Sequence, residues 1–190
     1  DTRNWTIFLV LSCVIGIGVR LQVMSQDFEA ILSRFGSDDL FYFTELAKNL
    51  KAGLGLTFDG KHLTNGVQPL WLLLLLPIAH LFEDPLCALR SVLLLATLVT
   101  VITALSFPKL LTLISPNNGF QIGVIAGSIY ILHPKILQIT FEGTEASIAA
   151  FAWLISIYAW VQSQQSNKYF LLGIALGLGV LARIDHLILV

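Results

Sequence analysis

Residues 91–108, SVLLLATLVTVITALSFP, contain no Asp, Glu, Lys or Arg and consist almost entirely of apolar side chains. Arg90 precedes this run and Lys109 follows it. A helix that crosses a membrane needs about 20 mostly apolar residues. Because the apolar residues are continuous and do not alternate with polar ones, a helix is favoured over a barrel strand. We therefore predict that this segment crosses a lipid bilayer as a helix.

The rest of the chain extends this pattern. The 190 residues are 56% hydrophobic and 12% charged, whereas a soluble domain carries about 25% charged residues. This composition excludes a soluble globule, a disordered tail and a disulfide scaffold. We expect an all-α integral membrane protein with about five to six transmembrane helices in a single domain, 1–190. Further charge-free runs cover 4–19, 62–82, 110–134, 146–167 and 169–182.

The charge balance argues against a nucleic-acid partner. Eleven Lys and Arg residues face twelve Asp and Glu residues, for a net charge of -1, whereas nucleic-acid binding needs a basic face. A few cations at one site would still suffice for a lipid phosphate. The two cysteines, Cys13 and Cys87, border or enter apolar runs, where a small apolar residue is the simplest interpretation.

The polar stretch of the N-terminal half is predicted to be a long external loop, 25–84, with two juxtamembrane helices. The first covers 38–51, where apolar side chains recur at spacings of three and four. Asp38 and Asp39 would lie in its first turn, where the helix dipole favours acids. Gly53 and Gly55 are expected to end this helix.

The second helix of this loop, 69–82, decides the topology. It is shorter than a full span and contains Pro77, which favours an interfacial or re-entrant helix, although a spanning helix stays open. If this segment does not span, all the later polar loops that carry acids lie on the side of Asp38 and Asp39. We favour the non-spanning arrangement, because it gathers the chemistry on one face.

Three groups of polar residues could carry chemistry. Adjacent carboxylates such as Asp38 and Asp39 can bind a divalent cation or accept a proton from a hydroxyl, although a helix N-terminus alone also explains them. Acids near a membrane helix tend to be functional, although helix capping also explains Glu142 and Glu145. The third group interrupts the last apolar run as a candidate anion site or a local ion pair: Arg183, Asp185 and His186.

Glycines of the last apolar run have a simpler interpretation. Gly173 and Gly177 form a small-xxx-small pattern, which is typical of helix packing. No P-loop, dinucleotide-binding glycine pattern, nucleophile elbow or Cys/His metal motif is present in the sequence.

Several motifs together resemble the GT-C superfamily, the polytopic glycosyltransferases that use polyprenyl-phosphate-linked sugars, including protein O-mannosyltransferases and arabinofuranosyltransferases. The order and spacing of the motifs carry the resemblance, which covers almost the whole chain. The motifs are SDDLFY at 37–42, AKNL at 47–50, GLG at 53–55, TNGVQPLW at 64–71, FEGTEA at 141–146, and GIALG at 173–177 with LARID at 181–185.

This resemblance implies an enzyme that moves a sugar from a polyprenyl-phosphate donor to an acceptor on the extracytoplasmic side of a plasma, inner or ER-type membrane. Asp38 or Asp39 would be the catalytic base, and Glu142 or Glu145 would be the acid of the second loop. If a metal takes part, Asp39 and Glu142 are the candidate ligands for Mg²⁺ or Mn²⁺. The expected phosphate and substrate contacts are Arg183, His186, Asn65, Gln68 and Arg90.

The resemblance also implies that the chain is the N-terminal part of a longer GT-C module, so further chains or a C-terminal part are expected partners beside the bilayer and the lipid-linked donor. Two other interpretations of the same residues stay open. One is a non-catalytic membrane scaffold or a subunit of a larger complex. The other is a transporter, against which the absence of a visible inverted repeat counts.

Overall fold

A computed structural model of the chain describes residues 2–35, 38–166 and 169–189, and for Asp38, Asp39 and Leu189 it describes the backbone alone. Within these residues every regular element is a helix and there is no strand, and the loop between α3 and α4 contains one isolated β-bridge, between Thr57 and Leu63. The helices are α1 (Thr2–Met24), α2 (Phe28–Phe35), α3 (Asp38–Lys51), α4 (Pro69–Leu81), α5 (Pro85–Ile114), α6 (Gly119–Leu132), α7 (Pro134–Phe141), α8 (Ala146–Ser166), α9 (Tyr169–Ala182) and the 3-10 helix η1 (Ile184–Leu189).

Three of these helices, α1, α5 and α8, are long and apolar enough to cross a membrane. The pair α6 and α7 qualifies as a fourth span if the two are taken together, although a 54° bend separates them. At about 1.5 Å per residue, the 14 residues of α9 reach about 21 Å, less than the roughly 30 Å of a hydrocarbon core. The all-helical fold with three to four candidate spans is compatible with an all-α membrane protein, and the expected count of five to six spans is not confirmed.

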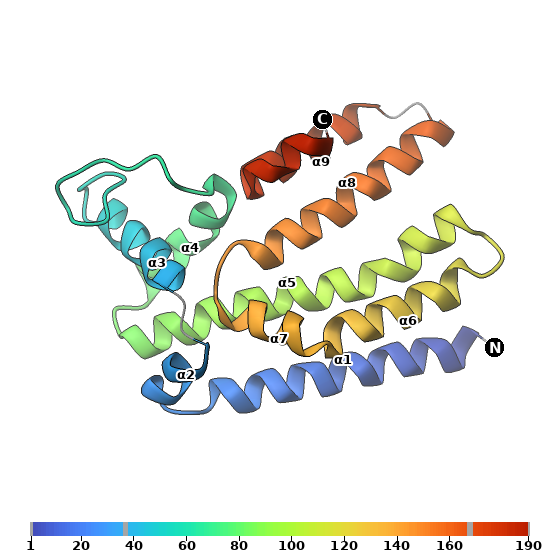
Figure 1. The fold of residues 1–190 in the computed structure, drawn as a ribbon, viewed down its shortest axis with the longest axis horizontal. Helices are drawn as coiled ribbons and strands as arrows, with labels where there is room; N and C mark the ends of the chain where they lie inside the picture. The colour runs from blue at the N-terminus through green and yellow to red at the C-terminus, as the bar shows by residue number, and fades with distance from the viewer. Residues whose placement is uncertain (1, 36–37, 167–168, 190) are drawn as a thin grey trace.

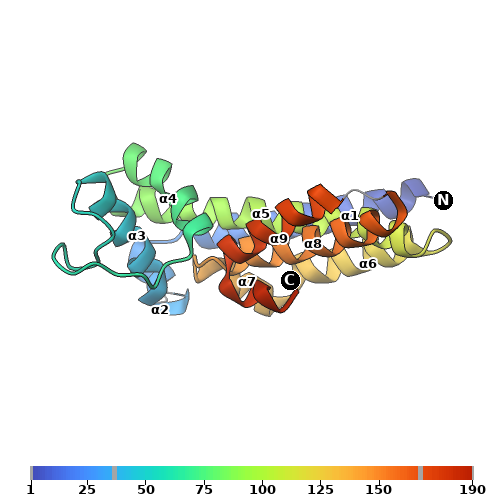
Figure 2. The same cartoon turned by 90° about the horizontal axis from the view of Figure 1, so that it is seen from above.

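The long helices form an elongated bundle with a separate layer at one end. In Figure 1, α1, α5, α6 and α8 run along the length of the molecule, and α2, α3 and α4 gather at the end opposite the N-terminus. Figure 2 shows the same separation from above. Helix α4 packs beside α3 in this end layer and also contacts α5 and α9. It is one of the shorter apolar helices, and the non-spanning arrangement of 69–82 stays a prediction.

Close packing of α6 on α5 depends on three glycines spaced by four residues. A Cβ at Gly119, Gly123 or Gly127 would overlap the backbone of α5, and this face of α6 is buried. Within a bilayer lipid is as apolar as leucine, so helices associate through such close contacts. The α5–α6 seam is therefore a backbone-to-backbone contact that only glycine allows.

The end layer has its own apolar core. Trp71 and Leu75 of α4 and Leu46 of α3 are almost fully buried and pack with Leu93 near the N-terminal end of α5. Full burial of one such side chain is worth about 1.5–3 kcal/mol where the alternative is water. Helix α5 therefore belongs both to the bundle and to the end layer, and it joins the two.

Several sequence predictions can be compared with this fold. The helix predicted at 38–51 is confirmed as α3, and Gly53 and Gly55, which follow it, have positive φ angles of 77° and 78°. Helix α2 was not predicted. Gly173 and Gly177 do not pack against another helix, because a Cβ at either would meet nothing within 4 Å among the described residues.

Replacement of Gly127 by alanine tests the α5–α6 seam. We expect Gly127→Ala to destabilise the protein by about 1–3 kcal/mol, since the new methyl group overlaps the carbonyl oxygen of Ala104. Gly173→Ala is the matched control, because it adds the same methyl group in open space and should be neutral or stabilising. Unfolding of both variants by denaturant in detergent micelles measures the difference. Equal effects of the two substitutions would contradict a glycine-dependent seam.

Candidate functional site

The turn between α7 and α8 carries both acids of the second loop and lies against α3. Gly143 adopts a left-handed conformation, with φ 62°. A Cβ on this residue would overlap the side chain of Leu40 and lie 3.5 Å from Val92 of α5. Only glycine therefore lets the turn approach α3 at the residue that follows Asp39. The first turn of α3 and the turn at 142–145 are neighbours in space.

An aromatic contact supports the same juxtaposition. The rings of Phe35, at the end of α2, and Phe141, at the end of α7, lie 4.8 Å apart between centroids. Phe141 is almost fully buried in the core of the end layer. Two contacts, Phe35 with Phe141 and Leu40 with Gly143, thus join segments that are about a hundred residues apart in sequence.

An ion cluster joins the start of α8 to the end of α9. Arg183 Nη1 lies 3.8 Å from Glu145 Oε1, and Arg183 Nε lies 2.9 Å from Asp185 Oδ2. The Glu145 side chain is only 13% exposed, against 45% for Arg183. Two acids therefore lie against one partly exposed cation.

His186 lies beside this cluster but is buried. Its ring packs 4.7 Å from that of Trp153, between centroids, and against Gly179 of α9. Burial lowers the pKa of the imidazole below its ordinary value of 6.5, so His186 is neutral at pH 7. A buried, neutral ring holds η1 against α8 and α9 and supplies no charge for a phosphate.

The other three predicted contacts lie on different segments from Arg183 and His186, in the loop before α4 and near the start of α5. Asn65 is exposed, and Gln68 is the N-cap residue of α4 without a side-chain cap bond. Their segment is attached to α3 by a hydrogen bond of 2.8 Å between Tyr42 and Thr64. Arg90 binds backbone carbonyls at the end of α1.

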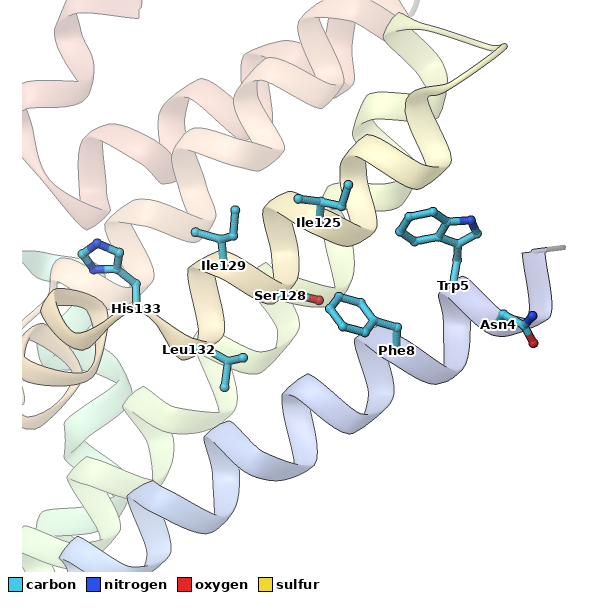
Figure 3. Close-up of a pocket in the computed structure, with 8 residues that line it drawn as sticks. All are labelled: Asn4, Trp5, Phe8, Ile125, Ser128, Ile129, Leu132 and His133. Carbon is cyan, nitrogen blue, oxygen red and sulfur yellow. The ribbon is translucent and has the colours of Figure 1, made fainter.

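The described side chains, which leave out those of Asp38 and Asp39, contain no group of three or more His, Cys, Asp or Glu that could hold a metal ion. The Mg²⁺ or Mn²⁺ site at Asp39 and Glu142 therefore stays a prediction. A cavity of about 690 Å³ lies elsewhere, between α1 and α6. Figure 3 shows its lining of Trp5, Phe8 and aliphatic side chains of α6, together with Asn4, Ser128 and His133. The mostly apolar lining suits hydrocarbon.

Arg20 has a role that sequence analysis missed. It is 1% exposed inside the apolar helix α1, and its Nη1 donates to the carbonyls of Gly16 and Ile131, each at 3.0 Å. In a continuous helix the N–H of Lys135 would donate to Ile131. Here Pro134 breaks the helix, and the N–H of Lys135 bonds to His133 Nδ1 at 3.1 Å.

Arg20 thus satisfies the carbonyl that the break leaves without its usual donor. The bend at this break directs α7 towards the end layer and delivers the turn that carries Glu142 and Glu145. The sequence signal for this role was a single arginine within an apolar span, together with the proline at 134 that ends the facing helix.

A double-mutant cycle tests this pairing of Arg20 with the break. Arg20→Met leaves a buried carbonyl without a donor and should cost about 1–3 kcal/mol of stability. Pro134→Ala allows the helix to continue, so that Lys135 can donate to Ile131. In the double variant we expect the cost of Arg20→Met to fall by about 1 kcal/mol or more. Denaturant unfolding in micelles measures the stability of wild type, of each single variant and of the double variant. Strictly additive changes in the free energy of unfolding would contradict the pairing.

Comparison of this chain with protein-family models, with curated proteins and with solved structures finds no match. The resemblance to the GT-C superfamily therefore stays a prediction from the motifs.

Proposed function

We propose that this chain is the membrane-embedded part of a glycosyltransferase that moves a sugar from a polyprenyl-phosphate donor to an acceptor hydroxyl on the extracytoplasmic face. One observation carries the proposal. The close approach of Gly143 to Leu40 joins the first turn of α3, with Asp38 and Asp39, to the acidic turn at 142–145. The order of the motifs in the sequence points to the same pair of segments.

The chemistry needs a base on one side of the reacting sugar and a cation on the other. When the acceptor oxygen attacks the anomeric carbon, its proton passes to a carboxylate, for which Asp38 and Asp39 are the candidates. The bond between the anomeric carbon and the phosphate oxygen breaks, and negative charge grows on the departing lipid phosphate. The partly exposed guanidinium of Arg183 is suited to stabilise that charge. A single displacement of this kind inverts the anomeric centre.

The two acids of the second loop have different parts in this proposal. Glu145 is mostly buried and lies against Arg183, so it orients the guanidinium. Glu142 is half-buried and remains available near the start of α3. Carboxylate oxygens are the ligands that Mg²⁺ and Mn²⁺ prefer, so Asp39 and Glu142 would hold such an ion, which would neutralise phosphate charge.

The second candidate function is a non-catalytic membrane scaffold or subunit, and one observation favours it. Glu145 and Asp185 already neutralise Arg183 within the protein, and His186 is buried. An ion cluster satisfied in this way can serve purely to hold α8, α9 and η1 together.

Acid substitutions in the whole protein test the proposed transferase. Radiolabelled sugar transfer from polyprenyl-phosphate donors would be measured in membranes that contain wild-type protein or Asp38→Asn, Asp39→Asn or Glu142→Gln at matched expression. Loss of the general base should lower the rate by about 100-fold or more. Glu45→Gln is the matched control, because Glu45 lies on the same helix α3 but forms an exposed pair with Lys48, 3.7 Å away.

Each outcome separates the interpretations. Loss of transfer in one aspartate variant, with normal insertion and an active Glu45→Gln control, supports the transferase and identifies the base. Transfer that survives all three substitutions removes the acidic site from the mechanism. Wild-type membranes that transfer no sugar from any donor favour the scaffold.

A further inference from the structure

A groove between α1 and α5 combines one cation, two hydroxyls and apolar walls. It has a volume of about 450 Å³ and is lined by Leu21, Met24, Ser25, Arg90, Ser91 and Leu94. Leu21 and Leu94 are about half exposed, at 49% and 45%. The groove is polar at Arg90 and the two serines and apolar along its other walls. This lining matches a lipid, which has a polar headgroup and apolar chains.

Arg90 retains a free donor for this groove. Its Nε donates to the carbonyl of Met24 at 2.9 Å, and its Nη2 donates to the carbonyl of Gln26 at 3.1 Å. These bonds fix the guanidinium at the C-terminal end of α1. Within the described part of the chain, no protein acceptor binds Nη1. Asp84, which interacts electrostatically with Arg90, accepts the backbone N–H of Cys87 at 2.7 Å.

The depth of Arg90 matches that of a lipid headgroup. The charge-free run 91–108 separates Arg90 from Lys109, and at about 1.5 Å per residue it spans about 27 Å, close to the thickness of a hydrocarbon core. Arg90 and Lys109 therefore mark the two ends of the apolar part of α5. With these two charges at the two surfaces of a bilayer, the phosphates of one leaflet would lie at the level of Arg90, and Leu94 would lie one turn deeper.

We infer that this groove binds the phosphodiester group of a bilayer phospholipid through Arg90 Nη1, with its acyl chains along Leu21 and Leu94. The site goes beyond the proposed glycosyl transfer. On α5, Arg90, Ser91 and Leu94 lie within about 100° of one another, whereas Val92, which contacts Gly143, lies on the opposite face. The body of α5 thus separates the groove from the acidic turn, so a phosphate held here is out of reach of those acids.

Ser91→Asp is the variant that tests the site. It places a carboxylate in the groove and leaves both carbonyl bonds of Arg90 in place. Ser33→Asp is the matched control, because Ser33 is also a surface serine that donates to a carbonyl of its own helix, that of Ala30 at 3.2 Å. Leu94→Gln provides a second variant that weakens the apolar wall instead.

Purified full chain would be delipidated in detergent and titrated with phosphatidylglycerol, with bound lipids counted by native mass spectrometry. We expect wild type and Ser33→Asp to bind one lipid more tightly than Ser91→Asp does, by about tenfold or more. We expect Leu94→Gln to weaken the binding of the same lipid.

Equal loading of all four proteins overturns the proposal, and it is also the result expected if a protein segment fills the groove. Equal weakening by Ser91→Asp and Ser33→Asp overturns it too, since the effect would then be one of net charge. Tighter binding of undecaprenyl phosphate than of phosphatidylglycerol at this site overturns the assignment to a bilayer phospholipid.

Discussion

The hydrogen bond from Arg20 to the carbonyl of Ile131 is the interaction on which the arrangement of the site depends. Inside an apolar bundle every backbone carbonyl needs a donor, because neither lipid nor apolar side chains supply one. The break at Pro134 removes the donor of Ile131, and the buried guanidinium replaces it. A charge that would be costly in an apolar helix is thereby held at the C-terminal end of α6, where the helix dipole favours a cation.

Helix α5 organises the molecule around this break. One of its faces receives the glycines of α6, another receives the turn of Gly143 at Val92, and a third presents Arg90 to the end of α1. Its N-terminal turns lie in the core of the end layer, with α3 and α4. The acidic turn and the α1–α5 groove are therefore both placed by this one helix, which also separates them.

Helices with strong local signals could be predicted from the sequence. The spacing of apolar residues and the glycines at 53 and 55 were sufficient to predict α3. Counting the predicted membrane crossings placed Glu145 and Arg183 on the same side, and the two residues do pair. The remainder depended on contacts distant in sequence. Neither the burial of His186 beside Trp153 nor the packing of Gly143 on Leu40 has a local signature. The packing glycines on α6 cannot be distinguished by pattern from Gly173 and Gly177 on α9, which face open space.

The glycine seam also has a consequence for how the protein is made. Helices α5 and α6 are joined by residues 115–118 alone, so the contacts between them are local along the chain. Local contacts form quickly, and a hairpin of two apolar helices can assemble as soon as both have left the ribosome. This hairpin would exist before α7, α8 and α9 emerge from the ribosome, and it would provide the surface against which these later helices pack.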